Sequence, residues 1–191
     1  MLAYRTGQYV TNSSSPEDKE SIKVIQEVAK KLKELAHYHT CDKNYYHFMG
    51  LQGFKRYHRY ESREAFELAM ELETLLVDQY GIEPEYQHIE FIAPIKRSVL
   101  DRMQEYINIL EITLNDANCA KTKLVLANHH FAACHVQKII DELSNDLKYA
   151  YRHFNYTKEI GGQIKDLHWY SHEIHEEYKE KEKCEHGREF V

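Results

Sequence analysis

Turn-forming residues are scarce in this chain, and their scarcity constrains its fold more than any other sequence feature. The 191 residues contain only seven glycines and three prolines, about 5% where an average protein has roughly 12%. Each hairpin of a β-sandwich or barrel needs such residues at its turn. The sequence therefore excludes a many-stranded β protein and predicts an all-α fold.

The few breaks that do occur divide the chain into five predicted helices. The serine-proline run before residue 16, the glycines at 50 and 53, Gly81, and the Gly161-Gly162 pair are the clearest of them. A further turn is expected at Asn115-Asp116-Ala117-Asn118, where short polar residues cluster. Between breaks, apolar residues recur at spacings of three, four and seven, which gives each long helix one core-facing stripe. The predicted helices cover residues 16–48, 54–80, about 94–114, 120–154 and 163–182.

The link between the second and third helices decides the topology. It runs from Gly81 to Pro94, and about 13 extended residues reach roughly 43 Å, the length of a helix here. A link of that length predicts a crossover that makes these two helices parallel, in an up-down-down-up four-helix bundle. The expected organisation is an N-terminal arm (1–15), the bundle (16–155), and a short C-terminal helix with a charged tail (156–191).

Composition narrows the functional class. The formal net charge of −6 argues against nonspecific nucleic-acid binding. With a mean hydropathy of −0.69 and no long apolar run, a membrane span is not expected. Residues 1–10 lack an apolar signal sequence. The four cysteines are widely spaced, without a CxxC pair, so reduced thiols in the cytoplasm are expected.

A few ionisable residues fall on the core-facing stripes. They are His39 on the first helix, Glu61 with Glu64 on the second, and His129 on the fourth, and the predicted turns place all of them near mid-bundle. Two imidazoles and one or two carboxylates can form the first coordination shell of iron, zinc or manganese. The alternative is a hydrogen-bonded Glu–His pair completed by a nearby tyrosine hydroxyl, because buried polar groups are usually satisfied in this way.

A second group of histidines lies near the C-terminus. His168, His172 and His175 stand at positions i, i+4 and i+7, so one helical face presents three imidazoles, a spacing that can chelate a metal. The alternative is a solvated polar face opposite the apolar residues of the same helix.

Several short stretches resemble the non-haem bacterial ferritins, members of the ferritin-like superfamily. The run LQGFKRY at 51–57, ESRE at 61–64 and QYG at 79–81 are similar to that family's second helix, and residues 130–139 to its fourth. The resemblance covers about residues 20–155. It implies a ferritin-like bundle that self-associates into a homo-oligomeric cage and stores iron, with the fifth helix placed to line a symmetry axis.

The resemblance also implies a ferroxidase site that departs from the family pattern. That pattern needs Glu-x-x-His on the second helix, and none occurs here. The ungapped match puts Ala65 and Leu68 at those two positions, whereas a one-residue slip puts Glu64 and Glu67 there. The positions that align with the family's other ligands lie away from the core stripes: Glu34, Asp101, Glu105 and His135.

The expected function is iron storage and detoxification, with iron or another divalent metal bound by the inner cluster. In that reading Glu61 and Glu64 hold iron while Fe(II) is oxidised to Fe(III). The alternatives are a non-catalytic helical scaffold, or a Dps-like protein without a working metal centre. Direct DNA binding is not expected, since the chain has no basic N-terminal arm.

Overall fold

The computed structural model describes residues 16–83 and 98–186, and in these two segments it contains helices and short turns. The helices are α1 (Pro16–Phe48), α2 (Gln52–Tyr80), α3 (Val99–Leu126), α4 (His130–Glu159) and α5 (Ile164–His186). At 1.5 Å per residue the first four are each roughly 40–50 Å long. None of the described helices is both long enough and apolar enough to cross a membrane.

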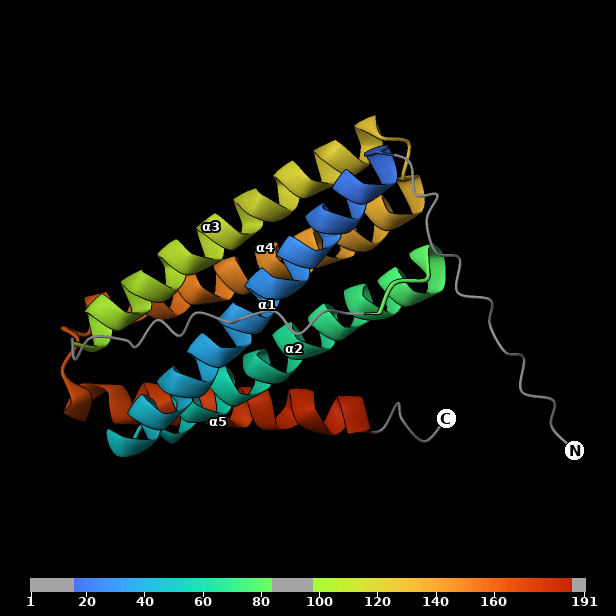
Figure 1. Ribbon diagram of the computed structural model, residues 1–191. Helices are drawn as coiled ribbons and strands as arrows, with labels where there is room; N and C mark the ends of the chain where they lie inside the picture. The colour runs from blue at the N-terminus through green and yellow to red at the C-terminus, as the bar shows by residue number, and fades with distance from the viewer. Residues whose placement is uncertain (1–15, 84–97, 187–191) are drawn as a thin grey trace, which may run out of the picture.

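The first four helices form two antiparallel pairs that pack together as a bundle (Figure 1). Helix α1 lies beside α2, and α3 lies beside α4. The end of α2 and the start of α3 lie at opposite ends of the bundle, so these two helices run in the same direction (Figure 1). The up-down-down-up topology predicted from the long link is therefore confirmed.

Local chemistry explains where these helices begin and end. Helix α2 stops at Gly81, which adopts a left-handed conformation at φ 62°. Helix α3 starts with a capping box, in which the Ser98 hydroxyl accepts from the Asp101 N–H and the Asp101 carboxylate accepts from the Ser98 N–H. Each cap satisfies backbone groups that have no partner inside the helix.

The turn expected at residues 115–118 is wrong. These residues lie inside α3, where the Asn118 side chain donates to the Leu114 carbonyl and Ala117 is buried. The chain turns instead at residues 127–129, around Asn128 at φ 62°. Asparagine tolerates this left-handed conformation better than most residues, so the reversal needs no glycine or proline.

The buried stripes follow the predicted spacing. Leu32, Leu72, Ile107, Leu110 and Val136 are fully buried and belong to one continuous core. Val125 is an exception, an apolar residue near the end of α3 that lies at the surface. It is 41% exposed, because α3 continues through the misplaced turn and presents that residue to solvent.

Helix α5 is a packed part of the molecule. It lies along α2 and runs in the same direction (Figure 1), and Leu167, Ile174 and Tyr178 are buried. The two helices approach closely at Gly53, where the N–H donates to the Ser171 hydroxyl at 2.8 Å. A Cβ at this position would lie 1.7 Å from the Ser171 carbonyl oxygen, so only glycine permits this contact.

Some expectations fall outside the described residues. They are the N-terminal arm (1–15), the link between residues 84 and 97 with the helix start near Pro94, and residues 187–191 of the charged tail.

Candidate metal centre

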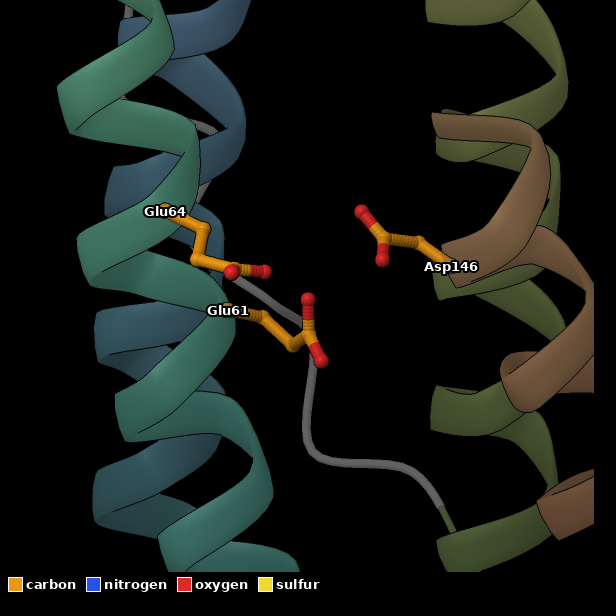
Figure 2. Close-up of side chains that lie close together, drawn as sticks. All are labelled: Glu61, Glu64 and Asp146. Atoms are coloured by element: carbon orange, nitrogen blue, oxygen red, sulfur yellow. The ribbon is translucent and has the colours of Figure 1, made fainter. Parts of the chain in front are cut away.

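Three carboxylates converge between α2 and α4. Glu61 and Glu64 project from α2 toward Asp146 on α4, as Figure 2 shows. One oxygen from each of the three lies within 4.8 Å of the others, and no other set of three or more potential ligands in the described residues converges in this way. We refer to Glu61, Glu64 and Asp146 as the acid cluster.

The acid cluster is held by tyrosine hydroxyls. The Tyr178 hydroxyl from α5 donates to Glu61 Oε1 at 3.2 Å, and the Tyr60 hydroxyl donates to Glu64 Oε1 at 2.8 Å. Glu61 is only 3% exposed, and its second oxygen, Oε2, is buried with no hydrogen-bond partner in the described part of the chain. A buried carboxylate oxygen without a partner costs free energy unless it gains a proton or a cation.

Burial and mutual repulsion make the acid cluster a strong proton acceptor. Burial raises the pKa of Glu61 well above its usual range, and the charges of Asp146 and Glu64 raise it further. Burial, followed by the charge of Glu64, raises the pKa of Asp146 to about 7. Near neutral pH the metal-free cluster therefore holds at least one proton, and a cation that replaces it would relieve the same repulsion.

His39 lies on α1 in the core, as predicted, but it pairs with another histidine instead of a carboxylate. Its Nδ1 is 2.9 Å from Nδ1 of His58 on α2. Burial lowers the pKa of His39 to about 3 and holds the pKa of His58 well below its usual range. Both rings are therefore neutral, with one donating to the other. His39 belongs to no group of three converging ligands in residues 16–83 and 98–186.

The expectation that His129 reaches mid-bundle is wrong. His129 immediately precedes α4, because the α3–α4 turn lies about ten residues later than predicted. Its Nδ1 lies 2.9 Å from the Tyr80 hydroxyl and its Nε2 lies 3.4 Å from the Asp18 carboxylate. Tyr80 ends α2, about 28 Å along the helix axis from Glu61, so His129 cannot share a metal with Glu61.

The three C-terminal histidines differ in their surroundings. His168 and His172 are exposed, while His175 is half-buried and accepts a hydrogen bond at Nε2 from Arg56 of α2 at 2.8 Å. The contact with Arg56 occupies Nε2, and His175 belongs to no group of three converging ligands in the described residues. The structure thus favours the polar-face interpretation for His175 and leaves the other two at the surface.

The positions aligned with the family's remaining ligands lie outside the acid cluster. Glu34 pairs with lysines on its own helix, Glu67 pairs with Arg63, and Asp101 caps α3. His135 packs edge-to-face against Phe131, with ring centroids 4.9 Å apart. Of the positions that the alignment gives, Glu64, from the one-residue slip, belongs to the acid cluster.

A buried ion pair was not anticipated from the sequence. Arg102 of α3 donates to Asp42 of α1, and both residues are buried. The guanidinium also lies over the Tyr45 ring, 3.9 Å from its centroid. Burial raises the pKa of Asp42 to about 7 even though Arg102 opposes the shift. The pair joins the two helix pairs, and Asp42 belongs to no group of three converging ligands in the part of the chain that the structure describes.

Of the comparisons with known proteins, the one with solved structures gives matches, and these concern the fold. No protein-family model and no curated protein matches the sequence. Among solved structures, the open-pore ferritin of the hyperthermophilic archaeon Archaeoglobus fulgidus superposes with a TM-score of 0.75 at 15% identity, covering 85% of this chain and 98% of that one. A humanized archaeal ferritin gives 0.76 at 15% identity with the same coverage. The chain therefore has the ferritin-like fold.

Proposed function

We propose that this protein stores and detoxifies iron in the cytoplasm as a ferritin-like, self-associating cage, with the acid cluster as its inner iron site. The observation that carries the proposal is the convergence of Glu61, Glu64 and Asp146 between α2 and α4, with a buried Glu61 oxygen that has no hydrogen-bond partner among the described residues. The ferritin-like fold supports it.

The donor set suits iron. Three carboxylates offer hard oxygen ligands, which suit hard cations such as Mn²⁺, Mg²⁺ and Fe(III). Three negative charges also stabilise Fe(III) more than Fe(II), since the attraction grows with the charge of the ion. Iron bound there would supply the redox chemistry with dioxygen or peroxide, and the protein would supply the charge that favours the oxidised ion.

Exposed apolar side chains on the surface support the inferred self-association. Several large apolar side chains are exposed, and two of them, Phe66 (50%) and Phe131 (57%), line a cavity of about 800 Å³ beside α2 and α4. Such patches commonly mark protein–protein contacts. Light scattering is expected to show a large homo-oligomer, and a monomer would end the storage proposal.

One observation favours the alternative of a scaffold without a working metal centre. The elevated pKa values of Glu61 and Asp146 allow these two carboxyls to share a proton, which would satisfy the acid cluster without any metal. Zinc or copper chemistry gains no such support, because no imidazole joins the three acids.

Aerobic addition of Fe(II), followed by ferric absorbance, separates the two functions. We expect oxidation faster than in buffer, and a decrease of at least about tenfold in the double variant Glu61→Gln/Asp146→Asn, as expected when metal-site residues are lost. The matched control is Glu67→Gln, an exposed acid on the same helix, which should retain the full rate. A wild-type rate equal to buffer contradicts iron oxidation, and an unaffected double variant contradicts the site.

A further inference from the structure

The Lys181 ammonium is held in a cage of aromatic rings next to the acid cluster. Its Nζ lies 4.3 Å from the ring centroids of Tyr149 and Tyr178, and 5.6 Å from that of Tyr60. These rings come from α4, α5 and α2 respectively. A cation over several tyrosine faces is attracted by each ring quadrupole, and the attraction is stronger where water is partly excluded. The cage therefore fixes the position of the positive charge.

Two of the three cage tyrosines also bind the acid cluster. Tyr178 presents its ring to Lys181 and donates its hydroxyl to Glu61, and Tyr60 does the same for Lys181 and Glu64. The third cage residue, Tyr149, lies one helical turn from Asp146 on α4. Each carboxylate thus has a neighbour that also contacts Lys181.

The charge of Lys181 acts on these carboxylates. It lowers the pKa of both Glu61 and Asp146, against the larger opposite effect of burial. A metal cation that enters the acid cluster is repelled by the same positive charge.

We propose that Lys181 is the resident counter-cation of the metal-free acid cluster and competes electrostatically with an incoming metal ion, which lowers the affinity of the cluster for metal. The inference rests on the proposed function, because it concerns the affinity of the same site. Its ligand class is hard di- and trivalent cations, and Lys181 acts as a positioning residue for charge, without coordinating the ion itself.

The sign of the effect follows from charge alone. Near neutral pH a divalent ion that enters the cluster and displaces one proton raises the local charge by one unit, and without proton loss it raises the charge by two. Either change is opposed by a fixed cation nearby. Removing that cation should therefore tighten binding, and more so for a trivalent ion.

The test is metal titration of the full-length protein with Tb³⁺, read by tyrosine-sensitised luminescence, and with Mn²⁺, read by electron paramagnetic resonance. We expect Lys181→Met to bind Tb³⁺ about tenfold more tightly, the equivalent of one pKa unit of charge interaction, with a smaller gain for Mn²⁺. Lys181→Arg keeps the charge and should behave like wild type. Lys183→Met removes an exposed lysine on the same helix and should change little. Glu61→Gln identifies the signal that comes from the acid cluster.

Each outcome decides the inference. Tighter binding in Lys181→Met with rescue by Lys181→Arg supports it, and misfolding cannot mimic a gain of affinity. Equal or weaker binding in Lys181→Met overturns it while leaving the metal site intact. If Lys181→Met binds and wild type does not, the inference stands and the proposed function of the native chain fails. If no protein shows a Glu61-dependent signal, both fail.

Discussion

Replacing Asp146 by asparagine in the metal-free protein should change how its stability depends on pH. Asparagine has nearly the same shape as aspartate and cannot titrate. The pKa of Asp146 is raised to about 7 in the folded protein, whereas an unfolded aspartate titrates near 3.9. Between these values the folded state binds more protons than the unfolded state, so the contribution of Asp146 to stability falls as pH rises from about 4 to about 7.

The magnitude follows from the same shift. About three pKa units correspond to at most ~4 kcal/mol. Asp146 is half-buried and shares its environment with Glu61, so solvent screening and coupling reduce the expected value to about 2–4 kcal/mol. Buried histidines act in the opposite direction: the pKa values of His39 and His153 are lowered to about 3, so their stabilisation is lost as pH falls. Both proteins contain these histidines, and the difference between them cancels this contribution.

Urea unfolding with a chelator present, at about pH 4.5 and pH 8, measures the effect. On going to the higher pH, the free energy of unfolding of Asp146→Asn should gain about 2–4 kcal/mol relative to wild type. The control is Asp141→Asn, which changes an exposed carboxylate on the same helix. If the stability difference between Asp146→Asn and wild type is the same at both pH values, the buried, repelled state of Asp146 is refuted.

Further predictions concern the packing. Leu72→Ala removes a fully buried side chain and should lower the unfolding free energy by about 2–5 kcal/mol. Leu126→Ala, at a residue 78% exposed, should change it by less than about 0.5 kcal/mol in the same urea titration. Equal effects of the two variants would contradict the assigned core. Arg102→Met leaves the buried Asp42 carboxylate without its ion-pair partner and should cost about 3–5 kcal/mol at pH 8, with recovery in the Arg102→Met/Asp42→Asn double variant; no recovery would refute a charge-based cost. Gly53→Ala should loosen α5 and speed hydrogen exchange there, because its Cβ would overlap the α5 backbone; unchanged exchange would show that the close contact does not hold α5 in place.

The architecture could be predicted because its signals are local and repeated. Scarce glycine and proline, long apolar stripes and one link of helix length together specify the helices and their directions. The fully buried Leu32, Leu72 and Ile107 show that the spacing identifies the core correctly. Repeated signals tolerate single errors, since each helix has many stripe positions.

The predicted metal site depended on the position of the turn between α3 and α4, and that position was predicted wrongly. Short polar residues at 115–118 suggested a loop, yet they lie at solvent-facing or small-residue positions within α3. The real turn relies on Asn128 in a left-handed conformation, a weak sequence signal. An error of about ten residues moves a helical position by about 15 Å, which was enough to bring His129 wrongly to mid-bundle.

Two residues that face the interior, Asp146 and His58, were missed although their spacing gave a signal. Asp146 follows the buried Leu143 by three positions, and His58 follows the buried Phe54 by four, so both fall on the apolar stripes. The same criterion that selected Glu61 would have found them. The contribution of α5, through Tyr178, had no comparable signal, because a fifth helix can pack on any face of a bundle.

Anomalous diffraction from crystals soaked in Fe(II) tests the central claim most directly. The account predicts an iron peak between α2 and α4, bounded by the carboxylates of Glu61, Glu64 and Asp146 (Figure 2). Iron peaks found only elsewhere, for example at the exposed His168 and His172, with none at the acid cluster, would contradict it.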